Sequence, residues 1–151
     1  YKHKFDGVIT NPPFGKTDEV DYDGYKIGSL EMVMALMALD CMKDSGRAAI
    51  IIGGHQNFDK EGRIQAGKNR TFFVYLYKHY HVLDVVNIDG HKLYSRQGTA
   101  FDTRLILIHG RKETPGGFPP IVEEKLPPTQ TNSYAPVESF EDLYERVSQY
   151  I

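Results

Sequence analysis

The alternation of apolar and polar residues along the chain predicts four β-strands and three helices. Strands are expected where β-branched and aromatic residues cluster in short runs, and helices where apolar residues recur every three or four positions. Strands and helices follow one another along the chain, which indicates an α/β fold. The strands are expected at residues 5–10, 47–54, 82–88 and 103–109, and the helices at 29–44, 70–80 and 138–151.

The first and last predicted helices differ in their apolar surface. Ser29 is a plausible N-cap of the first helix, Glu31 stands in its first turn, and Gly46 follows its end. Leucines and methionines surround nearly its whole circumference, which indicates a buried helix. The last helix has a capping-box pattern, Ser139 with Asp142, and a single apolar stripe that must dock on another surface.

The strand at 47–54 indicates how the sheet is arranged. Its unbroken apolar run is typical of a parallel strand covered on both faces. A helix joins it to the strand at 5–10, so the two strands should run parallel, with their carboxyl ends at one rim of the sheet. The polar stretches 16–27 and 55–70 are expected to be loops, the first of them mobile and beside that rim.

The strand at 5–10 is expected to be buried, and it stops abruptly at Asn11-Pro12-Pro13-Phe14. Both prolines lack a backbone N–H and have a fixed φ, so a β-ladder cannot continue through them. Pro12 also forces Asn11 into an extended conformation. The expected result is a stiff corner at the carboxyl end of a strand, which carries a side-chain amide, a free carbonyl and an aromatic ring.

These groups suit the binding of a planar molecule with an exocyclic NH2 group. The Asn11 side-chain oxygen can accept one of its hydrogens and the Pro12 carbonyl the other, while Phe14 can stack on the flat face. Holding both N–H bonds in this way draws the nitrogen lone pair out of conjugation with the ring, which makes the nitrogen a nucleophile without a strong base. A loop that merely contains two prolines is the other interpretation of these residues.

The segment Phe5-Asp6-Gly7-Val8-Ile9-Thr10-Asn11-Pro12-Pro13-Phe14 resembles the catalytic motif of the amino-methyltransferases, which transfer a methyl group from S-adenosylmethionine to an exocyclic or amide nitrogen. It is most similar to the N6-adenine DNA methyltransferases, in particular the modification subunits of type I restriction-modification systems, where glycine often follows the phenylalanine as Gly15 does here. The resemblance covers roughly residues 4–112. It implies the C-terminal half of a Rossmann-like methyltransferase sheet, mixed and flanked by helices, in which the last two strands are antiparallel.

The resemblance also implies roles for particular residues. Some family members sandwich the flipped adenine with an aromatic residue from the segment between the last two strands, and Tyr94 and Phe101 are the candidates. The family's strand that corresponds to 47–54 commonly ends in a proline-containing turn, whereas here it ends in Gly53-Gly54-His55. The catalytic residues would be Asn11, Pro12, Pro13 and Phe14, of which Asn11 would also contact the cofactor.

The predicted loop at 55–70 carries basic residues that can contact DNA phosphates. Lys60 and Arg63 are the candidates, and a fully solvated loop is the other interpretation of this stretch. The net charge of −2 neither favours nor excludes a nucleic acid partner.

Composition limits the compartment and the metal content. The single cysteine, Cys41, excludes an internal disulfide and fits a reducing compartment. No segment resembles a signal peptide and no apolar run is long enough to span a bilayer, so we expect cytoplasmic localisation and no membrane partner. The six histidines have no ligand spacing, which argues against a metal site.

The chain is expected to have three parts: 1–112 as the catalytic-motif half of a methyltransferase domain, 113–137 as a proline-rich connection, and 138–151 as an amphipathic helix. The family's S-adenosylmethionine pocket needs a Gly-rich turn and an acidic residue ahead of the corner, and neither stands here. We therefore expect a fragment of a longer adenine-specific DNA methyltransferase, inactive by itself, whose missing N-terminal half holds the cofactor. Its first strand would be an exposed sheet edge, which favours self-association.

Two other functions remain open. Methyltransferases that act on guanine-N2 of RNA or on protein glutamine use closely similar Asn-Pro-Pro-aromatic corners. A non-catalytic module for DNA docking or assembly could also retain the fold.

Overall fold

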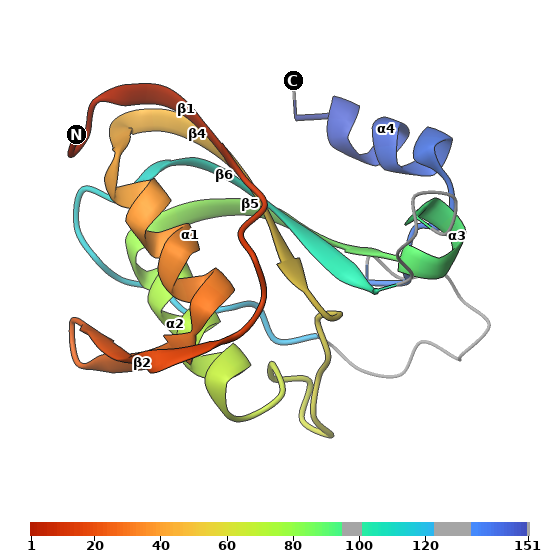
Figure 1. The fold of residues 1–151 in the computed structure, drawn as a ribbon, viewed down its shortest axis with the longest axis horizontal. Coiled ribbons are helices and arrows are strands. Elements are labelled where there is room, and N and C mark those ends of the chain that lie inside the picture. Colours follow the sequence, from red (N-terminus) through yellow and green to blue (C-terminus); the bar gives the residue numbers. More distant parts are fainter. Residues whose placement is uncertain (95–100, 123–133, 151) are drawn as a thin grey trace.

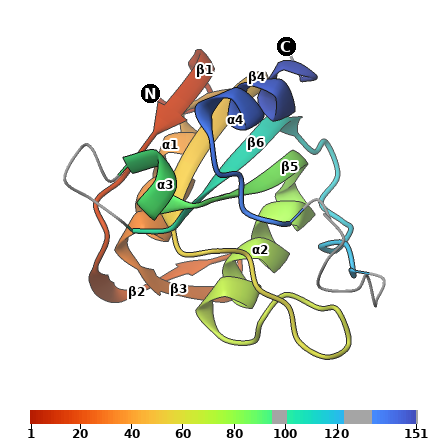
Figure 2. The same cartoon turned by 90° about the vertical axis from the view of Figure 1, so that its right-hand side faces the viewer.

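The computed structural model of the chain describes residues 1–94, 101–122 and 134–150. They form a layered α/β arrangement in which a central sheet carries helices on both faces (Figures 1 and 2). None of the helices in these ranges is long and apolar enough to cross a membrane.

The central sheet is mixed and has four strands. β1 (Phe5–Thr10) runs parallel to β4 (Met42–Gly53), while β6 (Thr103–Arg111) is antiparallel to both β4 and β5 (Tyr80–Ile88). The strand order is β1-β4-β6-β5. The predicted α/β class is confirmed, as are the parallel pair, the antiparallel pair and the position of the first strand at an edge of the sheet.

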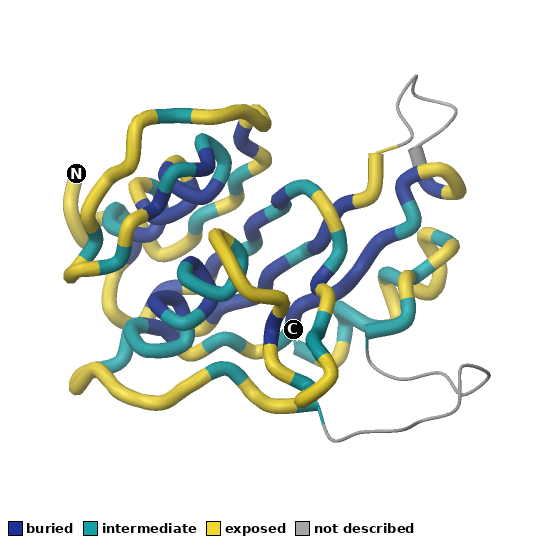
Figure 3. Tube along the Cα trace, turned by 90° about the horizontal axis from the view of Figure 1, so that it is seen from below, coloured by how far each residue is buried: buried dark blue, intermediate teal, exposed yellow. Residues whose placement is uncertain are grey.

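The hydrophobic core lies between the sheet and the two helices α1 (Leu30–Asp40) and α2 (Lys68–His79). Figure 3 shows buried segments running through the middle of the molecule, with exposed segments around them. Large aliphatic and aromatic side chains of both helices pack on the β-branched residues of the central strands, and burial of this apolar surface stabilises the fold. Fully buried members of this core are Met32, Leu36, Leu39, Ile50, Ile52, Phe72, Phe73, Leu76 and Ile106.

The first helix is shorter than the sequence predicts, because it ends at Asp40 rather than continuing to residue 44. The Arg111 guanidinium, from the end of β6, donates to the Leu39 carbonyl at 2.8 Å and to the Met42 carbonyl at 3.0 Å. A side chain distant in the sequence therefore satisfies carbonyls at the end of the helix. The chain enters β4 at Met42, so the prediction that Gly46 follows the helix end is wrong.

The prediction of a mobile loop at 16–27 is also wrong, because this stretch forms a β-hairpin. β2 (Lys16–Tyr22) pairs antiparallel with β3 (Tyr25–Ser29). Asp23 and Gly24 form the two-residue turn, with φ values of 53° and 86°. Positive φ at both positions is the requirement of a type I′ turn, which Asp-Gly meets readily. Aromatic contacts of Tyr22 and Tyr25 with Tyr75 hold the hairpin on α2.

Two further helices belong to the fold, one between β5 and β6 and one after β6. α3 (Gly90–Tyr94) is a short helix that the sequence analysis did not predict. α4 (Phe140–Ser148) is the predicted C-terminal helix, and the Ser139 hydroxyl accepts a hydrogen bond from the Asp142 backbone N–H at 3.1 Å, as expected of an N-cap. The predicted division into three parts stays a prediction.

Helix α4 lies on the face of the sheet opposite α1 and α2 (Figure 2). Arg146 binds both carboxylate oxygens of Asp84 on β5, at 2.7 and 2.8 Å, and the Tyr150 hydroxyl donates to the same carboxylate at 2.9 Å. Hydrogen bonds from Arg146 and the charge of Asp84 raise the pKa of the Arg146 guanidinium. A bidentate ion pair, rather than a buried apolar stripe, therefore anchors α4.

The strand β1 is more exposed than the sequence predicts. Phe5 is 46% exposed and Ile9 is 90% exposed. The expectation of a buried strand is wrong, because none of the residues of β1 is buried and this edge strand is covered less than the central strands.

Candidate functional site

Four elements meet at one rim of the sheet. β1, β4 and β5 end there, and the antiparallel strand β6 begins there, with Thr103 paired to both Gly53 and Ile88. The Gly54 N–H also donates to the Asp102 carbonyl at 2.8 Å. The predicted meeting of the Asn11–Phe14 corner and Gly53-Gly54-His55 at one rim is therefore confirmed.

At the corner, the Asn11 side chain faces solvent and Pro12 is buried. Asn11 and Pro13 are exposed, while Pro12 is buried. The Asn11 amide makes no hydrogen bond to any other described residue, and no described backbone or side-chain donor binds the Pro12 carbonyl. Burial of Pro12 holds the corner on the protein, and the Asn11 amide stays available to a ligand.

The Phe14 ring lies against the backbone of Gly53. A Cβ atom added to Gly53 would stand 3.3 to 3.5 Å from three atoms of the ring, so this glycine allows the close approach. Phe14 remains 47% exposed. The tip of the ring is thus supported by β4, and about half of the residue's surface stays exposed.

The downstream end of the corner is tied to the start of α1. The Gly15 N–H donates to the Glu31 carboxylate at 3.3 Å, and the Leu30 N–H donates to the Gly15 carbonyl at 3.0 Å. Because the corner is connected to β1 on one side and to α1 on the other, both of its ends are fixed.

A buried arginine lies directly behind the rim. Arg104 is only 3% exposed, and its guanidinium donates to the Gly53 carbonyl at 3.1 Å and to the Asn69 side-chain oxygen at 2.7 Å. It also binds the Gln56 side-chain oxygen and lies over the Phe73 ring. Burial lowers the pKa of Arg104 to about 10, so it remains a cation at neutral pH.

Arg104 is the centre of a larger group of polar side chains, which we call the Arg104 network: the buried residues Gln56, Asn87 and Arg104 itself, and the partly buried Asn69. The Asn87 side chain accepts from the Gln56 N–H at 2.7 Å and donates to the Tyr134 carbonyl at 2.8 Å. These bonds join β5 and β6 to the loop that follows β4. No carboxylate among the described residues lies within ion-pair distance of Arg104, so neutral oxygens solvate this buried charge.

The segment before β6 brings one of the two predicted stacking residues to the rim. Phe101 precedes Asp102, whose carbonyl binds Gly54, and its side chain is 71% exposed. His55 lies beside this segment, with Nε2 at 2.8 Å from the Ile88 carbonyl. Tyr94 ends α3, and its side chain lies outside the described part of the structure. The stacking roles of both aromatic residues stay predictions.

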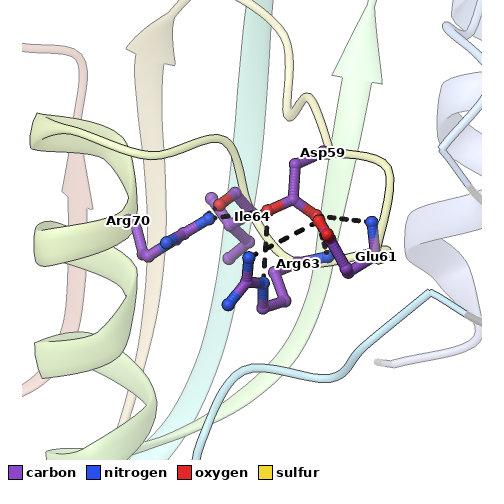
Figure 4. A network of polar contacts seen from close by, with 5 residues as sticks. All are labelled: Asp59, Glu61, Arg63, Ile64 and Arg70. Atoms are coloured by element: carbon purple, nitrogen blue, oxygen red, sulfur yellow. Dashed lines mark hydrogen bonds and ion pairs between the residues drawn. The ribbon is translucent and has the colours of Figure 1, made fainter.

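The two predicted phosphate contacts, Lys60 and Arg63, differ in their surroundings. Lys60 is exposed, whereas Arg63 forms ion pairs with Asp59 at 3.2 Å and Glu61 at 3.5 Å. Asp59 also binds Arg70 at 2.8 Å (Figure 4). Desolvation acts to raise the pKa of Asp59. The backbone N–H groups of Arg63 and Glu61 and the charges of Arg63 and Arg70 outweigh this effect and lower the pKa overall, so the carboxylate is charged at neutral pH. The charge of Arg63 is thus largely neutralised within its own loop.

Other basic residues line a depression that begins next to the corner, at Lys16. An open polar depression of about 510 Å³ is lined by Lys16, Lys26 and Lys68, together with Thr17, Glu19 and Thr71. Lys16 and Lys26 were not among the predicted phosphate contacts, because 16–27 was expected to be a solvated loop, whereas Lys68 lies in the stretch 55–70 that was expected to contact phosphates. The Asp23-Gly24 turn was the signal for a hairpin that would have brought Lys16 and Lys26 together.

No three His, Cys, Asp or Glu side chains are arranged to hold a metal ion in the part of the chain that the structure describes. Comparison of the chain with protein-family models, with curated proteins and with solved structures found no significant match.

Proposed function

We propose that this chain is the target-base half of an S-adenosylmethionine-dependent DNA methyltransferase that modifies the N6 atom of adenine. In this proposal Asn11 and the Pro12 carbonyl accept the two hydrogens of the adenine amino group, and Phe14 stacks on the extruded base. The partner is DNA, and the enzyme is of the kind that includes the modification subunits of restriction-modification systems.

One observation carries the proposal: an amide with no hydrogen-bond partner among the described residues stands at the end of β1, three residues before a half-exposed aromatic ring. Asn11 is exposed, and Phe14 lies against Gly53 on the neighbouring strand. An unbonded amide oxygen accepts the hydrogens of an amino group, and a supported aromatic ring stacks on a base in place of the stacking lost from the duplex. The two groups together suit a flat molecule that carries an NH2 group.

The chemistry required of these residues is polarisation rather than proton abstraction. The adenine amino nitrogen is a poor nucleophile because its lone pair is delocalised into the ring. Two acceptors that bind its hydrogens localise the lone pair on the nitrogen, and this interaction strengthens as positive charge develops there in the transition state. Neither acceptor takes up a proton, and the methylated nitrogen would release its surplus proton to solvent water.

The residues at the rim fit the target base better than the cofactor. S-adenosylmethionine supplies the methyl group when it is bound. Of the residues of this chain, we assign only Asn11 a contact with it, because no Gly-rich turn after a strand precedes the corner in the printed sequence. We therefore propose that another part of the protein provides most of the cofactor pocket, and that the 151-residue chain alone does not transfer methyl groups.

The test is a methyl-transfer assay of the complete protein from which this sequence comes, with isotope-labelled S-adenosylmethionine. Duplex DNA, RNA and a glutamine-containing protein are offered as separate substrates. We expect label on adenine N6 of DNA, and no label from the Asn11→Ala variant. Label on RNA guanine or on glutamine would overturn the choice of substrate. An absence of label on all three would favour a non-catalytic DNA-docking or assembly module.

A further inference from the structure

The polar depression beside the corner is a candidate binding site with a clear excess of positive charge. Three lysines from separate elements line it: Lys16 from β2, Lys26 from β3 and Lys68 from α2. Glu19 is the one acidic residue in its lining. We call this group of three lysines and the cavity that they line the lysine pocket.

Two of the lysines have no polar partner among the described residues. Lys26 forms an ion pair with Asp21 at 3.1 Å. Lys16 and Lys68 form no ion pair or side-chain hydrogen bond with any residue that the structure describes. This arrangement differs from that of Arg63, whose charge is neutralised by two carboxylates of its own loop.

The lysine pocket adjoins the corner through the backbone. Lys16 follows Gly15 directly and pairs with Ser29 at the end of the hairpin. Gly15 is itself fixed by its hydrogen bonds to Leu30 and Glu31. The first lysine is thus two residues from Phe14, on a backbone that is held in place at that point.

We propose that the lysine pocket binds the DNA backbone phosphates that flank the extruded adenine. The inference rests on the proposed function, because the phosphates that the lysines would bind belong to the DNA whose adenine is held at the corner. Lysine ammonium groups bind phosphate oxygens as point charges, and such contacts fix the position of a duplex without reading its sequence. An enzyme that takes a base out of the stack must hold the adjoining backbone while it does so.

The experiment measures binding of the 151-residue chain to a fluorescent DNA duplex at several salt concentrations. The duplex carries 2-aminopurine at a mismatched target position, so that fluorescence also reports extrusion of the base. The test variant combines Lys16→Gln with Lys68→Gln. The control variant combines Lys4→Gln with Lys43→Gln, which changes the net charge equally at the opposite rim, where β1 and β4 begin.

The expected result is that the slope of log K against log salt falls by about 1.8 for the test variant, since each phosphate contact contributes about 0.9. The control variant should retain the slope of the unmodified chain. A test variant that also retains this slope would overturn the lysine pocket as a phosphate site. Tighter binding of an RNA duplex of the same sequence, with the same dependence on the lysines, would overturn the assignment to DNA.

The fluorescence signal separates failure of this inference from failure of the proposed function. If the unmodified chain extrudes 2-aminopurine and the test variant keeps the salt slope, the lysine pocket is wrong while the adenine site stands. If the unmodified chain neither binds the duplex nor raises the fluorescence, both proposals fail. Thermal melting of each variant confirms that the exposed substitutions leave the fold intact.

Discussion

The corner and the Arg104 network both contact Gly53, and they hold their polar groups in opposite ways. At the corner, two prolines and the end of a strand fix the backbone, and the Asn11 amide stays exposed without a partner in the described structure. Behind it, Arg104 is 3% exposed and binds three oxygens of neighbouring residues. The corner can therefore bind a ligand, whereas the network has used most of its hydrogen-bonding capacity to position the rim.

This comparison predicts that substitutions in the two regions affect different measurements. Changes at the corner should alter binding or turnover and leave the fold stable, because exposed groups contribute little to stability. Changes in the network should destabilise the fold, because a buried polar group that loses its partner is costly.

The largest effect is expected for Asn11→Ala, measured in the complete protein as turnover of methyl transfer to DNA. We expect a loss of about 100-fold or more, because removal of one polarising group from a transition state typically has that effect. The midpoint of urea unfolding should not change, because Asn11 is exposed. A variant with more than about a tenth of the original turnover, against the loss expected for such a group, would show that Asn11 is not one of the two acceptors.

The second effect is a loss of stability in the Arg104→Met variant. Methionine keeps much of the side-chain volume but leaves the oxygens of Gly53, Gln56 and Asn69 without their donor. We expect the free energy of unfolding to fall by about 3 kcal/mol, as measured by urea denaturation.

Arg63→Met is the matched control for Arg104→Met. Its side chain is 52% exposed and its ion pairs are solvated, so the loss should be below about 1 kcal/mol. Equal losses in the two variants would contradict the distinction between a network that supports the rim and a solvated ion-pair cluster.

A smaller effect is expected for Phe14→Ala, measured as binding to a duplex with adenine at the target position. Loss of one aromatic–base stack should weaken binding by about 1–3 kcal/mol. A mismatch at the target should restore part of this loss, because a mismatched base is easier to extrude. If the mismatch has no effect and the variant is destabilised, Phe14 belongs with the core rather than with the site.

The smallest signal is expected when the isolated chain is titrated with S-adenosylmethionine. Neither the corner nor the Arg104 network offers enough contacts for a ligand of that size, so calorimetry should detect no binding. Micromolar binding would mean that the cofactor site lies within these residues, and the division into a target-base half and a cofactor half would be wrong.

The sequence was sufficient to predict the four strands of the central sheet, the helices α2 and α4 and the placement of the corner, because each depends on local patterns; the hairpin of β2 and β3 was missed. Two prolines end β1 wherever it lies, and the apolar run of β4 specifies a central strand. The end of α1 was not predictable in this way, since it depends on Arg111, a residue that only the fold brings to Leu39 and Met42.

The charged residues were the least predictable part of the site. Arg63 looked available in the sequence, but the fold places Asp59 and Glu61 on it. Lys16 looked solvated, but the hairpin and α2 bring it to the same cavity as Lys68. Arg104 lies in an apolar strand sequence, and no local pattern indicated that it would be buried and would position the rim through hydrogen bonds. Whether a charge is free depends on its neighbours in space, which a single sequence does not specify.

The position of β1 at the edge of the sheet has a consequence for mass action. Its outer edge has no strand partner among the described residues, and the strand's Ile9 is 90% exposed. Any partner that pairs with the folded edge but not with the unfolded chain shifts the equilibrium toward the folded state. If the expected self-association occurs through this edge, the melting temperature of the chain should rise with its own concentration, and a stability measured at one dilution would describe an association equilibrium as well as a fold.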